Sequence, residues 1–143
     1  MPLVRQRLAA GQTVRYLPFR GVSMLPMLRQ RKDAVEIGPV KEPLRKYDLP
    51  VYQYPSGKYV MHRIVKVERD HYVCLGDNTY EYEHIRPEQI LAVVVAFRRG
   101  EKRISVENFG YRCYSKFWVG IFPLRKLLKR AKGWLRRKFR GAN

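Results

Sequence analysis

Three short blocks of the sequence contain residue types that could perform acyl-transfer chemistry. The first is Gly21-Val-Ser-Met-Leu-Pro26, the second is Met61-His-Arg-Ile-Val65, and the third is Gly76-Asp-Asn78. A serine hydroxyl is a weak nucleophile at neutral pH, so it needs a base within hydrogen-bond reach and donors for the oxyanion that forms after attack. The blocks together supply a serine, a histidine and an acid.

The candidate nucleophile is Ser23, which lies in an expected turn between two strands. Such a turn presents the hydroxyl and backbone N–H groups at one place, and we therefore expect Gly21 and Val22 to shape the oxyanion site. Met24 and Pro26 follow the serine directly and are expected to contact the substrate.

The candidate general base is His62, which lies within an apolar strand pattern where an imidazole is unusual. The ordinary pKa of an imidazole, about 6.5, suits proton transfer near neutral pH. A carboxylate would orient the ring and favour the imidazolium form. Asp77, Glu81 and Glu83 are the candidates for this third residue.

Each block also has a structural explanation when it is considered alone. A serine in a turn most often stabilises the turn, and a histidine in a strand is most often an ordinary core or surface residue. Gly-Asp-Asn is a common turn sequence. The catalytic interpretation therefore depends on the three blocks occurring together and in this order.

In that order the blocks resemble the superfamily of signal peptidase I and LexA-type serine peptidases, over roughly residues 11–106. In this superfamily the serine of Ser-Met-x-Pro is the nucleophile, a position that Ser23 matches. Bacterial signal peptidases place a lysine base before Arg-Val, whereas the archaeal, endoplasmic-reticulum and sporulation-type enzymes have histidine there. His62 therefore resembles the histidine branch. The resemblance also implies that Asp77 packs near the base.

The sequence departs from the family pattern at several positions. Signal peptidases often have a second hydroxyl two residues before the nucleophile, where this chain has Gly21. The acidic pair that follows Gly-Asp-Asn is replaced by tyrosines and by Glu81 and Glu83. The second β region and the membrane anchor of the bacterial enzymes have no counterpart in the sequence.

Short apolar strands separated by Gly, Pro and Asp predict a mainly β fold, a coiled antiparallel sheet or partial barrel. A hairpin is expected with its turn at residues 55–58. The expected strands span residues 14–19, 34–39, 49–54, 59–67, 72–75, 87–97 and 103–106. A short helix is expected over residues 3–10.

The C-terminal region changes to apolar residues at three- and four-residue steps with Lys and Arg between them, which predicts an amphipathic basic helix. We expect a break near Pro123 and a weak point at Gly133. Its apolar stripe either packs on the β domain or, over residues 117–140, lies on an anionic membrane surface.

The charge of the chain is concentrated in this region. Of a net charge of +18, residues 111–143 supply eleven Lys and Arg and no acid, which leaves only +7 for the first 110 residues. Such a segment fits anionic lipid, nucleic acid or an acidic protein. Nucleic acid is not expected as the partner, because no DNA-reading motif is present and the eleven residues before the peptidase-like region are too few for a DNA-binding domain.

Two cysteines without a metal-binding spacing predict neither a disulfide framework nor a metal site, and no cofactor is expected. No apolar run fits a signal peptide or a membrane span, so we expect a cytoplasmic protein, peripheral on the inner face of the membrane if the basic helix binds lipid.

These observations predict a catalytic β domain over residues 1–110 and a helical tail over residues 111–143. The predicted activity is that of a serine endopeptidase that cleaves a peptide or protein substrate, such as a small precursor peptide matured near the membrane. The alternative is a catalytically degenerate module of the same fold that binds peptides or tethers a partner to the membrane.

Overall fold

A computed structural model describes residues 2–16 and 21–141 of the chain. In chain order its elements are α1 (Pro2–Ala9), β1 (Val14–Tyr16), β2 (Asp33–Gly38), β3 (Pro50–Gln53), β4 (Tyr59–Met61), β5 (Arg63–Val67), β6 (Tyr72–Leu75), β7 (Glu83–Ile85), the 3₁₀ helix η1 (Pro87–Gln89), β8 (Ile90–Arg99), β9 (Lys102–Ser105), α2 (Phe109–Gly120) and α3 (Phe122–Arg140). Residues 14–16 of the expected first strand form β1, and residues 17–19 lie outside the described part.

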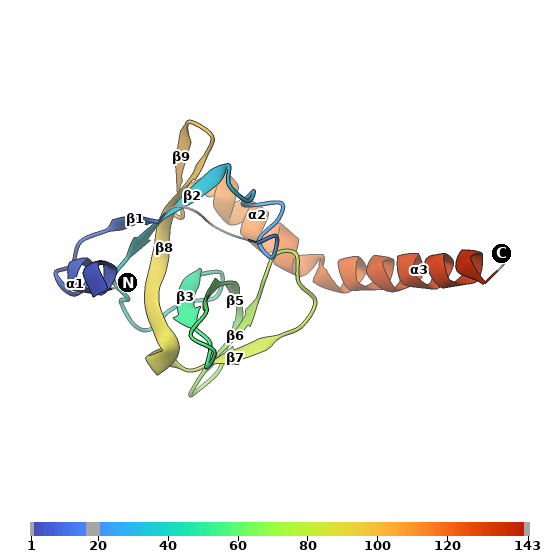
Figure 1. Cartoon of the computed structure of the whole chain (residues 1–143), viewed down its shortest axis with the longest axis horizontal. Coiled ribbons are helices and arrows are strands. Elements are labelled where there is room, and N and C mark those ends of the chain that lie inside the picture. Colours follow the sequence, from blue (N-terminus) through green and yellow to red (C-terminus); the bar gives the residue numbers. More distant parts are fainter. Residues whose placement is uncertain (1, 17–20, 142–143) are drawn as a thin grey trace.

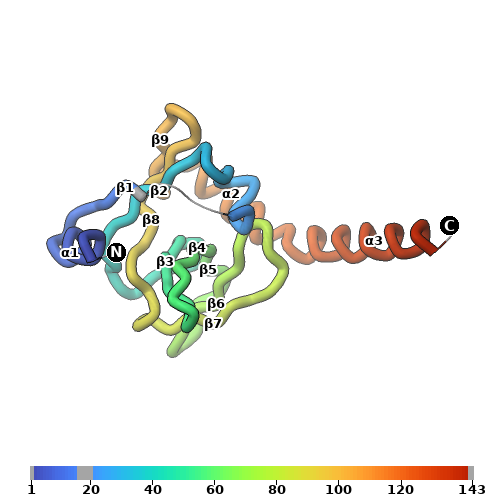
Figure 2. The backbone as a smooth tube through the Cα atoms, viewed as in Figure 1, coloured from blue at the N-terminus to red at the C-terminus, as the bar shows by residue number. Residues whose placement is uncertain are grey.

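The strands form two antiparallel sheets (Figures 1 and 2). The larger sheet has the order β1-β2-β8-β3-β4, with β9 also paired to β8, and the smaller has the order β5-β6-β7. The expected antiparallel pairing and C-terminal helix are confirmed. The expectation of a mainly β fold is not, because helix and strand contribute 31% and 30%, and the described strands do not close into a barrel.

Strand β8 is the central strand of the larger sheet, and its sequence suits a strand that is covered on one face. Ala92, Val94 and Ala96 alternate toward the core and are buried, while β-branched neighbours fill the positions between them. Met24, Met27 and Leu28 of the loop before β2 pack into this core. A second cluster, around Tyr52, Ile64 and Cys74, lies where the two sheets meet.

The segment expected to be one strand over residues 59–67 is divided at His62. Residues before it form β4, which pairs with β3, and residues after it form β5, which pairs with β6. Tyr47 and Asp48 hold the start of β5 through backbone hydrogen bonds with Ile64 of 2.8 and 2.9 Å. His62 is therefore the residue at which the chain passes from the larger sheet to the smaller one.

The two C-terminal helices differ in their environment. Helix α2 starts two residues before the expected boundary at residue 111, with the Asn108 side chain accepting a hydrogen bond from the N–H of Tyr111 at 3.0 Å. It packs on the β domain through Tyr111 and Ser115, whereas α3 extends away from the domain (Figure 1). Helix α3 begins at Phe122 with Pro123 in its first turn, and it continues through Gly133. No described helix has the length and hydropathy needed to cross a membrane.

Candidate active site

The imidazole of His62 is held by Glu83, the first residue of β7. His62 is 6% exposed, and its Nδ1 lies 2.9 Å from Oε2 of Glu83. Glu83 reaches this position because β7 pairs with β6, where Cys74 stands opposite it in the register. Of the three acids proposed from the sequence, Glu83 is the one that contacts the histidine, while Glu81 is exposed.

Two tyrosines, Tyr52 and Tyr54, also bind the Glu83 carboxylate. The hydroxyl of Tyr52 on β3 donates to Oε2, and that of Tyr54, just after β3, donates to Oε1. Burial, reinforced by these hydrogen bonds, raises the pKa of both hydroxyls, so both stay protonated and act as donors. Glu83 is thereby fixed by three neighbours at once.

Two opposing effects act on the ionisation of Glu83. Burial raises the pKa of the carboxyl, but the hydrogen bonds from His62, Tyr52 and Tyr54 outweigh burial and lower the pKa to about 2. The carboxylate is therefore ionised throughout the neutral range. An ionised acid beside the imidazole stabilises the charged ring, as a triad carboxylate does.

The same contacts assign the tautomer of His62. The Tyr52 hydroxyl lies 3.0 Å from Nδ1, but its proton is directed to Glu83. Nδ1 must then carry a proton of its own, which it donates to Glu83, because two acceptors would otherwise face each other. In the neutral form of this tautomer the lone pair lies on Nε2, which makes no hydrogen bond with any described residue.

The segment that contains Ser23 is held against His62 by the third block. The backbone N–H of Asn78 donates to the Ser23 carbonyl at 2.8 Å, and its side-chain amide donates to the Val22 carbonyl at 3.1 Å. A Cβ atom on Gly76 would lie 2.7 Å from the Ser23 carbonyl oxygen and 3.0 Å from Cδ2 of His62. The serine backbone and the Nε2–Cδ2 edge of the imidazole are therefore neighbours, with Gly76 in contact with both.

The hydroxyl of Ser23 is not joined to the imidazole in this conformation. Ser23 is half-buried in a turn, and no hydrogen bond connects its Oγ with His62, both of which are among the described residues. In unliganded enzymes such contacts are often long and shorten when substrate binds. The fold places the Ser23 backbone and the His62 imidazole next to Gly76 without a hydrogen bond between Oγ and the ring.

The other residues expected around Ser23 have different environments. Gly21 has a φ of +111°, a backbone conformation that favours glycine, and Val22 is exposed beside it. Met24, which was expected to contact substrate, is fully buried in the larger core cluster. Pro26 is exposed and remains accessible to a substrate.

The carboxylate of Asp77, which the family resemblance places near the base, bonds to residues other than His62. Its carboxylate accepts two hydrogen bonds from the buried Arg63, from Nε at 2.9 Å and from Nη2 at 2.8 Å, and one from the Tyr114 hydroxyl at 2.8 Å. Arg63 follows the histidine in sequence and is fully buried. Asp77 therefore neutralises the buried guanidinium of Arg63.

This ion pair also anchors the C-terminal helices. Nη1 of Arg63 donates to Tyr111 and Ser115 of α2, each at 2.8 Å. The Asp77 carbonyl accepts hydrogen bonds of 2.7 Å from Trp118 of α2 and from Arg125 of α3. Both helices therefore fix Asp77, which directly precedes Asn78.

Sequence reasoning missed four residues of this arrangement: Tyr52, Tyr54, Arg63 and Asn78. Tyr52 and Tyr54 are two residues apart at the end of a strand, a spacing that directs both hydroxyls to one face. That spacing was the available signal. Nothing in the sequence indicated that Arg63 would be buried, since arginine is rarely found in the interior.

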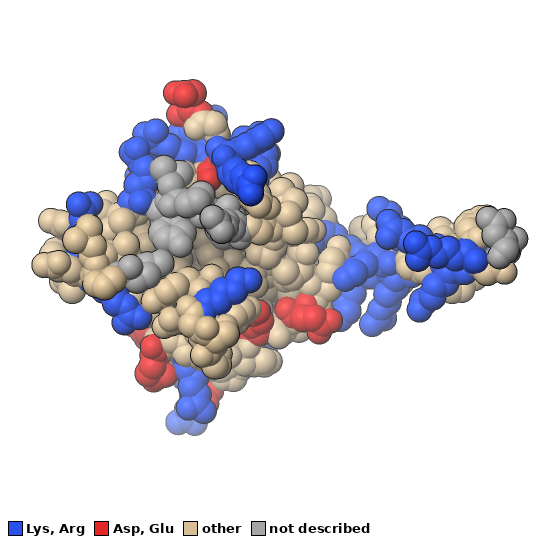
Figure 3. Space-filling model, viewed as in Figure 1, with Lys and Arg blue, Asp and Glu red and all other residues tan. Residues whose placement is uncertain are grey.

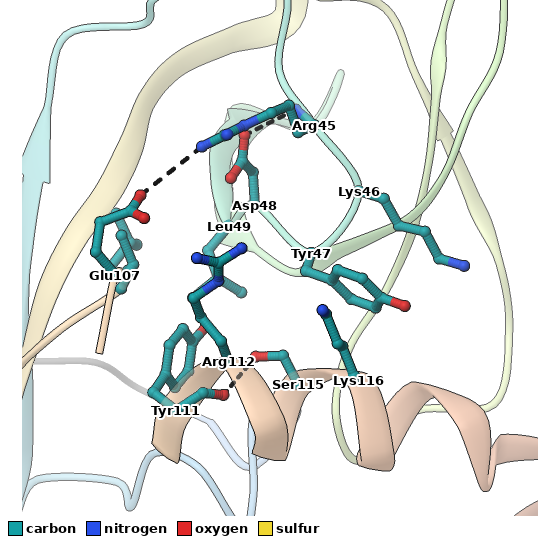
Figure 4. Close-up of a pocket in the computed structure, with 12 residues that line it drawn as sticks. Arg45, Lys46, Tyr47, Asp48, Leu49, Glu107, Tyr111, Arg112, Ser115 and Lys116 are labelled. Carbon is teal, nitrogen blue, oxygen red and sulfur yellow. Dashed lines mark hydrogen bonds and ion pairs between the residues drawn. The ribbon is translucent and has the colours of Figure 1, made fainter. Parts of the chain in front are cut away.

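A separate cavity of about 230 Å³ lies between residues 45–49 and α2 (Figure 4). Arg45, Lys46, Arg112 and Lys116 contribute to its lining, and Arg45 pairs with Glu107 across it at 3.7 Å. Neither Ser23 nor His62 lines this cavity. The candidate active site is therefore defined by the contacts around His62.

The described residues contain no group of three or more His, Cys, Asp or Glu that could hold a metal ion. Both cysteines are free thiols, and burial raises the pKa of the Cys74 thiol to about 12. No protein-family model, curated protein or solved structure matched the chain.

Proposed function

We propose that the chain is a serine endopeptidase in which Ser23 is the nucleophile, His62 the general base and Glu83 the residue that orients the base. One observation carries the proposal: Glu83 holds Nδ1 of His62 at 2.9 Å, while the opposite edge of the ring borders the Ser23 segment. An ionised carboxylate on Nδ1 is the partner that orients the imidazole and stabilises its charged form in the Ser-His-Asp arrangement.

In the proposed reaction, Oγ of Ser23 attacks the peptide carbonyl and its proton passes to Nε2 of His62. The tetrahedral intermediate collapses as the C–N bond breaks, and the imidazolium gives its proton to the leaving amine. Water, deprotonated by the same imidazole, then hydrolyses the acyl-enzyme and restores the Ser23 hydroxyl. Backbone N–H groups of the turn at Val22 and Ser23 supply the oxyanion donors.

The substrate is an extended peptide segment that pairs with a free strand edge. Strand β4 ends the strand path of the larger sheet and leads directly into His62. A peptide added along such an edge is held by backbone hydrogen bonds, which are independent of sequence. The position of β4 would bring a bound peptide to the catalytic residues.

Labelling by serine-directed peptidyl probes tests the proposal. Wild-type protein is expected to be labelled by these probes at neutral pH. Ser23→Ala and His62→Ala should each abolish labelling while the protein stays folded. Failure of several probes to label folded wild-type protein would count against catalysis.

The absence of a Ser23–His62 hydrogen bond among the described contacts favours one alternative, a peptide-binding module with the same fold but without turnover. This alternative predicts that peptides bind with equal affinity to wild-type protein and to Ser23→Ala, and that neither protein cleaves them. Cleavage by wild-type protein alone would exclude it.

A further inference from the structure

The apolar side of α3 has no covering element in the described structure. Leu124 is 55% exposed, Leu127 62% and Phe139 72%, and Leu128, Trp134 and Leu135 are exposed in the same way. Over its 19 residues the helix is about 29 Å long, and these side chains lie along one stripe. The stripe does not pack on the β domain, which was one of the two arrangements expected from the sequence.

The opposite side of α3 is basic and turned toward the domain. Lys126, Arg130 and Arg137 line a hollow together with Tyr80 and Glu81 of the β domain. These basic residues stand two positions after Leu124, Leu128 and Leu135, which is roughly 200° around a helix of 3.6 residues per turn. The apolar stripe consequently points away from the domain.

The first two turns of α3 anchor it to the rest of the protein, and in the second turn Lys129 lies 4.1 Å from the centre of the Tyr80 ring. Phe122 is buried against Tyr80 and Tyr82, with ring centroids 6.1 and 5.5 Å apart. Arg125 lies over the Trp118 ring at 4.3 Å while it donates to the Asp77 carbonyl. The helix therefore projects from a fixed base, and the apolar side chains along its remaining length are exposed.

The charges of α3 indicate which partner fits. The helix holds nine Lys and Arg and no acid, and Figure 3 shows these side chains along its length. Two copies of such a helix would repel each other if their stripes were paired. A nucleic acid would neutralise the charges but leave the apolar stripe in water. An anionic lipid surface satisfies both faces at once.

Trp134 and Lys138 fit the lipid interface in particular. Lys138 lies close to the stripe, with its ammonium group 4.9 Å from the centre of the Trp134 ring. A long lysine in this position can bury its methylene chain and keep its charge at the headgroups, where tryptophan also resides. We propose that α3 lies in the surface of an anionic membrane, with Leu124, Leu128 and Leu135 inserted and the β domain on the opposite side of the helix.

Vesicle flotation of the full chain tests this proposal. Binding to phosphatidylserine–phosphatidylcholine vesicles is expected to exceed binding to pure phosphatidylcholine and to weaken with added salt. The double variant Leu128→Gln/Leu135→Gln keeps the charge and helix propensity and should lose roughly tenfold or more in partitioning. The matched control, Leu3→Gln/Val67→Gln, replaces exposed apolar residues outside α3 and should bind within about twofold of wild type.

Tryptophan emission of the wild-type protein gives a second measurement that does not depend on the folding of the leucine variant. On vesicle binding, wild-type emission should shift to the blue and be quenched by brominated lipid, and Trp134→Phe should remove both changes. No vesicle binding, or binding that the leucine variant leaves unchanged, would overturn the proposal. Tighter binding to duplex DNA at the same salt, unaffected by the leucine variant, would replace it with a nucleic-acid function.

Discussion

Oε2 of Glu83 lies 2.9 Å from Nδ1 of His62, and the two residues reach each other from different parts of the fold. His62 occupies the passage between the two sheets, and Glu83 begins β7, two strands away from β5 in the smaller sheet. The contact forms only when the smaller sheet has its native pairing. The proposed catalytic unit is therefore a product of tertiary structure, which makes each of its members open to a specific test.

The role of Glu83 can be separated from that of its neighbour Glu81. Glu83→Gln keeps the size of the side chain but removes the charge that favours the imidazolium, so probe labelling should slow by about 100-fold or more. Glu81→Gln changes an exposed acid two residues away and should leave the rate unchanged. Equal effects of the two variants would contradict the assignment of Glu83.

The stability contributed by Glu83 should depend on pH. Its pKa is lowered in the folded protein from the ordinary 4.5 to about 2, so its contribution is complete above about pH 4.5 and is lost as the pH falls toward 2. The difference in unfolding free energy between wild type and Glu83→Gln, measured with urea, should therefore shrink over this range. The pKa values of Asp33 and Glu36 are also lowered, but their contributions to the unfolding free energy are the same in both proteins and cancel in the difference. A difference that stays constant from pH 7 to pH 2 would exclude the ionised carboxylate.

Gly76 should not tolerate a side chain. The added methyl of Gly76→Ala would lie 2.7 Å from the Ser23 carbonyl oxygen and 3.0 Å from Cδ2 of His62, so the variant should lose about 1–3 kcal/mol of stability and its labelling. Gly133→Ala provides the control, since nothing lies within 4 Å of its position in α3. That variant should be neutral or stabilised by up to about 1 kcal/mol. Normal labelling by Gly76→Ala would disprove the contact.

Asp77 should affect stability more than chemistry. Asp77→Asn leaves the guanidinium of Arg63 buried without its counter-ion, which costs about 3–5 kcal/mol of unfolding free energy. Glu107→Gln removes an exposed pairing with Arg45 and should cost less than about 1 kcal/mol. Labelling of the folded Asp77→Asn protein should stay within about tenfold of wild type, far above Glu83→Gln. A stable but unlabelled Asp77→Asn would return Asp77 to a catalytic role.

The sequence was informative wherever a local pattern decided the structure. Alternation and β-branched residues predicted β8, the turn at residues 55–58 predicted the β3–β4 hairpin, and the three- and four-residue steps predicted α3. The three blocks also identified residues that the fold brings together, since Gly76 contacts both Ser23 and His62. In each of these cases the structure depends on residues that are close together in the sequence or on a pattern that known proteins share.

Other features depend on contacts between distant segments. The sequence does not indicate that the strand expected over residues 59–67 changes sheets at His62, because both halves have the same apolar pattern. The choice between Asp77 and Glu83 depends on which acid Arg63 neutralises, and that contact exists only in the folded core. β7 has three residues, too few for a recognisable periodicity. The change of sheet at His62, the choice between the two acids and the formation of β7 all depend on tertiary packing.

The hydrogen bonds from Trp118 and Arg125 to the Asp77 carbonyl have a consequence for how the protein is made. The ribosome synthesises Ser23, His62 and Glu83 first. Asn78 holds the Ser23 carbonyl, and the preceding residue, Asp77, is bound by Trp118 and Arg125, which follow it by 41 and 48 positions. A nascent chain that ends before α2 has all three side chains but lacks the hydrogen bonds from Trp118 and Arg125 to Asp77. We therefore expect chains truncated before α2 to show no labelling by serine-directed probes.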